Sequence, residues 1–144
     1  MTESRGPSRL IIIVNSDLNM SAGLMSAQVS HVSELVGYNA ARAMSDLTLG
    51  MGLEGGDTGG FRGGDTGGLD VLEYEYWRTN PITIIKRAPL AAIIRFIQEF
   101  GTKKIRFELF RDSVPGLIPD NTITCLAIYP GQQVPAEIDE LGLA

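Results

Sequence analysis

Residues 10–44 read LIIIVNSDLNMSAGLMSAQVSHVSELVGYNAARAM, and this stretch decides the fold because an apolar run leads through a short polar loop into a helix. The run at residues 10–14 has no polar alternation, which is typical of a strand covered on both faces of an α/β sheet. Gly23 predicts a flexible point in the loop. Apolar side chains then recur at helical spacing and predict a helix over residues 27–44.

The chain has the size of one domain. Its 144 residues, 44% of them hydrophobic, suffice to bury roughly 68–70% of the unfolded surface. We expect a flexible leader at residues 1–9 and a single α/β domain at residues 10–144, with a glycine-rich insert at about residues 49–69.

The N-terminal residues and the cysteine content predict a cytoplasmic location. The first nine residues are polar and lack an apolar signal core, and no apolar run approaches the roughly 20 residues of a membrane-spanning helix. Cys125 is the single cysteine, so it forms no internal disulfide, and its apolar surroundings indicate a small buried side chain.

The net charge of −5 argues against a general affinity for nucleic acid. The charges are unevenly distributed, however, because residues 86–111 are mainly basic and residues 54–75 mainly acidic. The basic segment is able to attract phosphate. Both segments are equally compatible with ordinary solvated faces of helices and strands.

The insert contains the hexapeptide GGDTGG twice, at residues 55–60 and 63–68, with Phe61 and Arg62 between the copies. Glycine at this density predicts a flexible surface loop. The alternative is a lid or intersubunit arm in which Phe61 and Arg62 contact a ligand. We expect no metal site, since calcium-binding glycine loops have a different period and more repeats.

The remaining chain predicts further strands and helices. Residues 71–77 fit either a short strand or a helical turn. Strands are expected at residues 82–86, 105–110 and 123–129, a helix at residues 90–100 that Gly101 terminates, and a short acidic helix after residue 135. This order predicts a small mixed sheet with helices on both faces.

Several polar side chains stand at strand ends and at the start of the first helix: Asp17, Gln28, His31, Asp112 and Thr124. Such residues converge in many binding sites of α/β proteins. His31 is the general-base candidate, although a lone helical histidine more often packs or caps. Because the sequence has neither a nucleophile motif nor zinc-ligand spacing, the residues alone do not specify a reaction.

Several of these segments together resemble the type II peptidyl-tRNA hydrolases of archaea and eukaryotes. The family has an aspartate after its first strand, a Met-Gly-Lys-Gly-Lys loop, an Ala-Gln-x-x-His helix start and an Asp-Ala-Gly-Arg-Thr-Gln segment before a Thr-x-Leu strand. The corresponding residues here are Asp17, 20–24, 27–31 and 112–131. The similarity also includes residues 80–86. The resemblance implies a three-layer α/β/α sandwich around a mixed four-stranded sheet, and a homodimer.

The resemblance also shows which functional positions differ. Gln28, Asp112 and Thr124 are retained, whereas the two lysines of the family's loop fall on Ala22 and Leu24. The family's Arg-Thr pair falls on Pro115 and Gly116 in an ungapped alignment. Ester hydrolysis develops oxyanion charge, and loss of one donor to that charge typically costs about 10²–10³ in rate.

Three functions follow as hypotheses. The first is a non-hydrolytic, possibly sequestering, protein that binds a nucleotide-like or aminoacyl-adenosine-like ligand. Its expected ligand-binding residues are Asp17, Leu24, Gln28, Phe61, Arg62, Asp112 and Thr124. We expect no cofactor, metal or membrane partner.

The second hypothesis is an active peptidyl-tRNA or aminoacyl-tRNA hydrolase that binds the 3′ end of tRNA. Its catalytic residues would be Asp112, Thr124 and His31, with Lys86 or Arg87 in place of the lost lysine. The third is a scaffold protein with the insert as its contact surface. A continuous basic track leading from the site would favour tRNA, whereas an isolated site would favour a small ligand.

Overall fold

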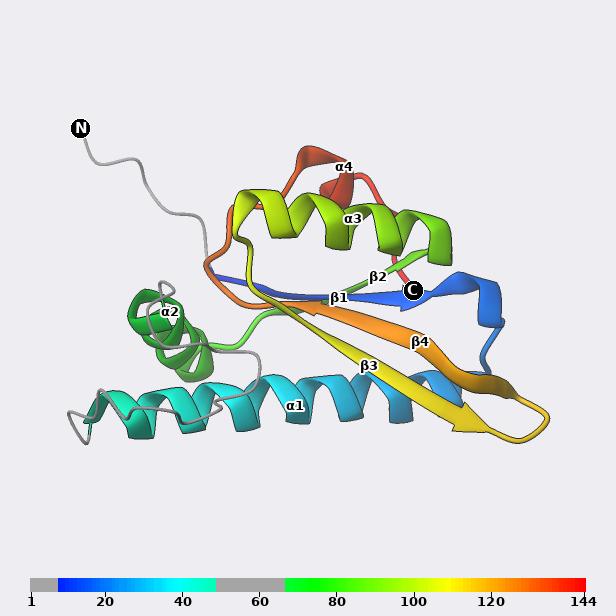
Figure 1. The fold of residues 1–144 in the computed structure, drawn as a ribbon, viewed down its shortest axis with the longest axis horizontal. Coiled ribbons are helices and arrows are strands. Elements are labelled where there is room, and N and C mark those ends of the chain that lie inside the picture. The colour runs from blue at the N-terminus through cyan, green and yellow to red at the C-terminus, as the bar shows by residue number, and fades with distance from the viewer. Residues whose placement is uncertain (1–7, 49–66) are drawn as a thin grey trace.

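The computed structural model describes residues 8–48 and 67–144, which form a four-stranded mixed sheet with helices on both faces (Figure 1). The strands are β1 (Leu10–Asn15), β2 (Thr83–Ala88), β3 (Phe107–Val114) and β4 (Ile118–Ile128). Their order is β2-β1-β4-β3. β1 is parallel to β2 and antiparallel to β4, and β4 is antiparallel to β3. The predicted α/β fold with β1 and β4 inside the sheet is confirmed.

The helices form the two outer layers. Figure 1 shows α1 (Ala22–Thr48) and α2 (Gly67–Thr79) on one face, and α3 (Leu90–Lys103) and α4 (Ala136–Asp139) on the other. A short 3₁₀ helix, η1 (Ser16–Leu18), connects β1 to the loop before α1. The loop after β1 therefore leads directly into the start of α1.

Strand β1 supplies side chains to both halves of the core, which explains its unbroken apolar sequence. Ile12 packs with Val32 and Val36 of α1 on one face of the sheet. Ile13 packs with Phe96 of α3 on the other. All six residues of β1 are buried.

Helix α1 begins at Ala22, five residues before the predicted start. The Oγ of Ser21 accepts a hydrogen bond from the N–H of Leu24 at 3.2 Å, the arrangement of a serine N-cap. Gly23 therefore lies in the first turn of the helix, and the prediction that it loosens a loop is wrong. The cap brings the Ala22 and Leu24 positions onto α1.

Helix α3 passes through Gly101 and ends at Lys103, so the prediction that Gly101 terminates it is also wrong. The left-handed C-terminal residue is Lys104, with φ of 56°, and its N–H donates to the carbonyl of Phe100. The N–H of Ile105 donates to the same carbonyl at 3.0 Å. A lysine thus occupies the conformation in which glycine is the usual residue.

The structure shifts the boundaries of other predicted elements and assigns a segment that the sequence left open. Residues 71–77, which the sequence left open, belong to helix α2. Residues 67–69 of the predicted insert are also helical, and residues 49–66 lie outside the described part. β3 begins two residues and ends four residues later than predicted, whereas β4 begins five residues and ends one residue earlier. The two strands form a hairpin, in which Leu117 N–H donates to Val114 O at 2.9 Å. Pro115 and Gly116, with φ of 78° at the glycine, form its turn.

Candidate functional site

Gln28 connects three elements of the fold through its side-chain amide. It lies on α1 and is only 1% exposed. Its Nε2 donates to Oδ2 of Asp112 on β3 at 2.8 Å, and its Oε1 accepts from the Oγ1 hydroxyl of Thr124 on β4 at 2.8 Å. A neutral amide therefore uses its donor end on a carboxylate and its acceptor end on a hydroxyl, which is the arrangement that its chemistry requires.

A β-bulge brings Thr124 to the α1 face of the sheet. The flanking residues of β4 alternate regularly, with Cys125 toward α1 and Leu126 toward α3. Counted back from Cys125, strict alternation would turn Thr124 toward α3 and Ile123 toward α1, yet Ile123 packs on the α3 side. The register between β3 and β4 shifts where Phe110 pairs with Cys125 and Arg111 with Ile123, which leaves Thr124 as the additional residue. The bulge reorients the threonine so that its hydroxyl reaches Gln28.

Asp112 is held as a carboxylate by neutral donors. Its Oδ1 accepts from the backbone N–H of Ser113 at 2.8 Å, while Gln28 occupies Oδ2. The Gln28 hydrogen bond lowers the pKa of Asp112 below its ordinary value, and the Ser113 N–H and the charge of His31 act in the same direction against a smaller effect of burial. Asp112 is half-buried, so part of the ionised group remains open to a ligand.

His31 lies one turn of α1 beyond Gln28 and beside the same strand as Asp112. Its ring stacks on Phe110 with centroids 4.9 Å apart and an interplanar angle of 27°. The histidine is exposed. It therefore presents an aromatic face and a titratable group at the edge of the Gln28–Asp112–Thr124 cluster.

Asp17 has a different position from the one predicted. Its Oδ2 accepts from the N–H of Leu90, the first residue of α3, at 3.0 Å. Its own N–H donates to Oδ1 of Asn15, whose Nδ2 donates to the carbonyl of Ile123 on β4. Because Pro89 supplies no side-chain cap to α3, Asp17 provides that cap from the loop after β1, and the structure shows no contact between Asp17 and the Gln28 cluster.

The remaining predicted residues divide into two groups. Leu24 lies four residues before Gln28, on the same face of α1, and is half-buried. Phe61 and Arg62 lie outside the described residues, so the structure gives no account of the predicted lid.

A second buried polar cluster fixes α1 further along its length. Asn39 Nδ2 donates to Oε2 of Glu108 at 2.7 Å, and the hydroxyl of Tyr129 donates to the same oxygen at 2.5 Å. Burial, followed by the neighbouring Glu108 charge, raises the pKa of Tyr129 far above its ordinary value. Sequence reasoning missed this cluster because its three residues come from distant segments with no motif between them.

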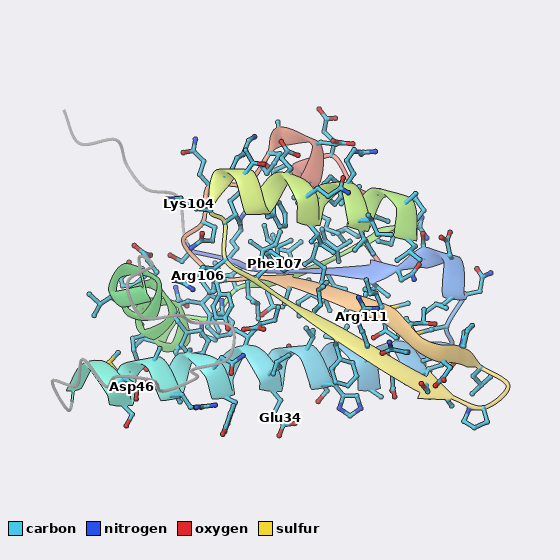
Figure 2. All side chains as sticks on the ribbon, viewed as in Figure 1. Glu34, Asp46, Lys104, Arg106, Phe107 and Arg111 are labelled. Atoms are coloured by element: carbon cyan, nitrogen blue, oxygen red, sulfur yellow. The ribbon has the colours of Figure 1, made fainter. Side chains whose placement is uncertain are left out.

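The basic segment of residues 86–111 does not form a continuous track in the described part of the chain. Lys86 donates to the carbonyls of Asp139 and Leu141, both at 3.0 Å. Arg95 pairs with Glu137, and Lys103 with Glu99. Figure 2 shows Lys104 and Arg111 toward opposite ends of β3. The basic side chains are therefore dispersed among acidic and carbonyl partners.

The sequence model of the family described as Peptidyl-tRNA hydrolase PTH2 matches residues 8–140. The chain belongs to this family. No curated protein matches it. Membership in the PTH2 family confirms the recognition made from the sequence and agrees with the mixed sheet and its flanking helices.

The described residues contain neither a metal-ligand cluster nor a membrane-spanning helix. Residues 8–48 and 67–144 include no group of three or more histidine, cysteine, aspartate or glutamate side chains placed to hold a metal ion. Over the same residues, no helix has both the length and the apolar character needed to cross a membrane.

Proposed function

We propose that this PTH2-family protein binds a nucleotide-like or aminoacyl-adenosine-like ligand through Asp112, which the buried Gln28–Thr124 pair orients, without hydrolysing it efficiently. The observation that carries the proposal is the set of donors around Asp112. Both donors are neutral, namely the Gln28 amide and the Ser113 N–H. Among the described residues, no lysine or arginine forms an ion pair with this carboxylate.

The chemistry of the cluster favours a nucleoside. An ionised carboxylate accepts hydrogen bonds from ribose hydroxyls, as acidic residues do in dinucleotide-binding folds. The stacked His31 and Phe110 rings offer an aromatic surface to a base. Leu24, on the same face of α1 as Gln28, adds apolar contact.

The same cluster lacks a feature that efficient ester hydrolysis needs. The first turn of α1 carries Ala22 and Leu24 where the resembled type II enzymes have lysines. Neither side chain can stabilise an oxyanion, and loss of one such donor typically costs about 10²–10³ in rate. We therefore expect binding to persist while turnover is weak.

Calorimetric titration of a non-hydrolysable aminoacyl-adenosine analogue tests the proposal. Asp112→Asn should weaken binding about tenfold, the effect of one charge-assisted hydrogen bond. Gln28→Leu should also weaken binding, because Asp112 then loses the donor that orients its carboxylate. Asp139→Asn removes the same charge from an exposed ion pair with Arg9 and serves as the matched control. Equal affinities for all four proteins would place the ligand elsewhere, and absence of binding would favour a scaffold function.

The second candidate is peptidyl-tRNA hydrolysis, which family membership favours. In this reaction the Asp112 carboxylate, which is ionised at neutral pH as an ordinary aspartate is, would position and activate a water molecule. Peptidyl-tRNA cleavage at a rate typical of the family, abolished by Asp112→Asn, would establish this function and overturn the first. If turnover is weak in the native protein, Leu24→Lys should increase it.

A further inference from the structure

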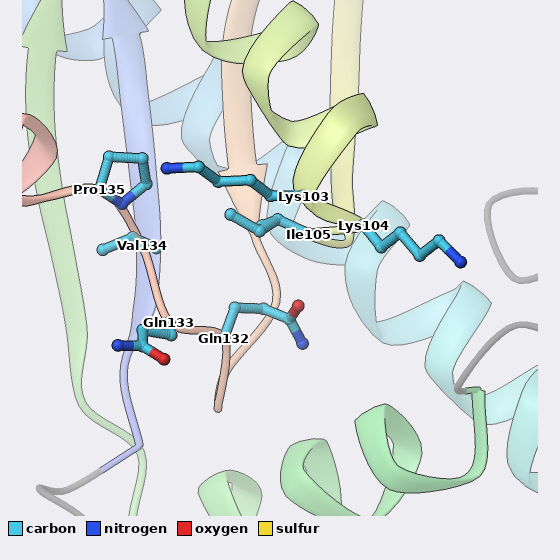
Figure 3. Close-up of a pocket in the computed structure, with 7 residues that line it drawn as sticks. All are labelled: Lys103, Lys104, Ile105, Gln132, Gln133, Val134 and Pro135. Carbon is cyan, nitrogen blue, oxygen red and sulfur yellow. The ribbon is translucent and has the colours of Figure 1, made fainter.

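A cavity of about 360 Å³ lies at the C-terminal end of α3 and is lined by residues 103–105 and 132–135 (Figure 3). It is separate from the Gln28 cluster. The cavity adjoins the start of β3, whereas Asp112 lies near the end of that strand, and a strand rises about 3.3 Å per residue. The volume falls within the range of about 300–1,000 Å³ that small-molecule sites occupy.

The lining combines cations and amides with an apolar surface. Lys103 and Lys104 come from the end of α3, and Gln132 and Gln133 from the loop after β4. Figure 3 shows Lys103 extending toward Pro135 across the loop, while Lys104 extends in the opposite direction. The two ammonium groups therefore stand on opposite sides of Ile105.

The local charge favours an anion although the whole chain is acidic. Lys103 and Lys104 are the charged residues of the lining, which contains no carboxylate. Glu137 of α4 is paired with Arg95, and Glu73, whose side chain lies beside Gly131, accepts a hydrogen bond from Ser8. An anion entering the cavity therefore meets more positive than negative charge.

The ion pair between Lys103 and Glu99 can be exchanged for a ligand. Lys103 Nζ lies 2.8 Å from Oε1 of Glu99, and both side chains are partly exposed, by 52% and 33%. Exposed pairs of this kind contribute little to stability. A phosphate group, with more charge and more acceptor atoms than the carboxylate, is able to compete for the lysine.

We infer that this cavity binds the phosphate group of a nucleotide or a polynucleotide, independently of any ligand at Asp112. The lysines supply the charge, and the amide of Gln133, on the loop after β4, supplies a donor. Ile105, Val134 and Pro135 supply apolar contact for the organic part of the ligand. The backbone N–H groups of Lys104 and Ile105 are committed to the Phe100 carbonyl, so recognition rests on side chains.

Amide chemical shifts of the full chain, titrated with inorganic phosphate at constant ionic strength, test the inference. The amides of residues 103–105 and 132–134 should shift and saturate, while sodium chloride produces no such change. Lys103→Gln should weaken the affinity for phosphate about tenfold. Glu99→Gln should strengthen that affinity severalfold, because the substitution frees Lys103 from its ion pair.

Two matched variants remove the effect of net charge. Arg78→Gln and Glu75→Gln alter the ion pair on α2 by the same charges and should leave the phosphate affinity unchanged. If Lys103 and Lys104 serve only to neutralise the C-terminal end of α3, Lys103→Gln will lower the melting temperature but not the affinity, and the inference fails. Absence of saturation also overturns it.

The source of the phosphate is decided by two further probes. Adenosine monophosphate should produce saturable shifts at the cavity amides if the natural ligand is a free nucleotide. A short RNA hairpin should shift the same amides more strongly than the mononucleotide if the cavity holds a polynucleotide backbone. A shift pattern confined to the Gln28 cluster with both probes contradicts the cavity assignment and leaves the proposed function standing.

Discussion

Gln28 donates from Nε2 to Oδ2 of Asp112 across 2.8 Å while it remains 1% exposed. A buried neutral amide thus sets the ionisation of a more accessible carboxylate. The amide itself is oriented by Thr124, so the carboxylate depends on a residue that it does not touch. Residues from α1, β3 and β4 act here as one unit.

Gln28→Leu is expected to raise the pKa of Asp112 toward its ordinary value of 3.8, since it removes the largest cause of the lowering. In the native protein the pKa of Asp112 is lower in the folded state than in the unfolded state. Its carboxylate therefore stabilises the fold above about pH 4, and this contribution is lost as the pH falls through the folded-state pKa. Carboxyl carbon chemical shifts of Asp112 measure the change. Gln98→Leu, on an exposed position of α3, is the control and should leave this pKa unchanged.

Asp17→Ala should reduce the free energy of unfolding by about 0.5–2 kcal/mol, because α3 then begins without a side-chain cap. Asp17→Asn keeps an acceptor for the Leu90 N–H and should recover most of the loss. Urea unfolding of the three proteins provides the measurement. If ligand binding falls in Asp17→Ala while stability is unchanged, the residue serves the site rather than the helix.

Gly131→Ala and Gly101→Ala should shift stability in opposite directions. Gly131 has φ of 84°, and a Cβ there would lie 2.7 Å from Cγ of Glu73, so alanine should destabilise the fold by about 1–3 kcal/mol. Gly101 lies inside α3 with no neighbouring atom within 4 Å of an added Cβ. Alanine there should stabilise by roughly 0.5–1 kcal/mol. Thermal unfolding of both variants checks the pair, and two shifts of the same sign would contradict it.

Cys125 should resist alkylation while the protein is folded. The side chain is fully buried, and burial raises its thiol pKa to about 12 from 9.0. Iodoacetamide should therefore react only with the unfolded protein. The labelling rate should rise with denaturant concentration in step with the unfolded fraction. Because the folded-state pKa is the higher one, this thiol stabilises the fold below about pH 9, and the effect fades as the pH rises toward the folded value. Rapid labelling in native buffer would refute this expectation.

The sequence predicted the features that depend on local pattern. The apolar run of β1 and the helical spacing of α1 were sufficient to place the sheet and its first covering helix. Gln28, Asp112 and Thr124 were grouped correctly because they follow the order of a known family. Helix α1 starts five residues earlier than its apolar spacing indicates, because Ser21 caps it and the first turn tolerates Gly23.

Other features depend on contacts that no local pattern contains. Asp17 caps a helix that begins at Leu90, a relationship that becomes visible only when β1 and β2 lie side by side. Thr124 reaches Gln28 through a bulge, whereas regular alternation predicts the opposite face. The cavity beside Lys103 is formed by the end of α3 and the loop after β4, which meet only when α3 packs on the sheet that contains β4.

The position of β1 in the sheet has a consequence during synthesis. Ile11 pairs with Ile84 on one side and with Ile128 on the other, so this strand leaves the ribosome well before either neighbour exists. At roughly 5–20 residues per second, the wait for β4 lasts on the order of ten seconds. A fully apolar segment is exposed throughout that time, and chaperones that hold such segments are therefore expected to determine how much nascent chain reaches the native state.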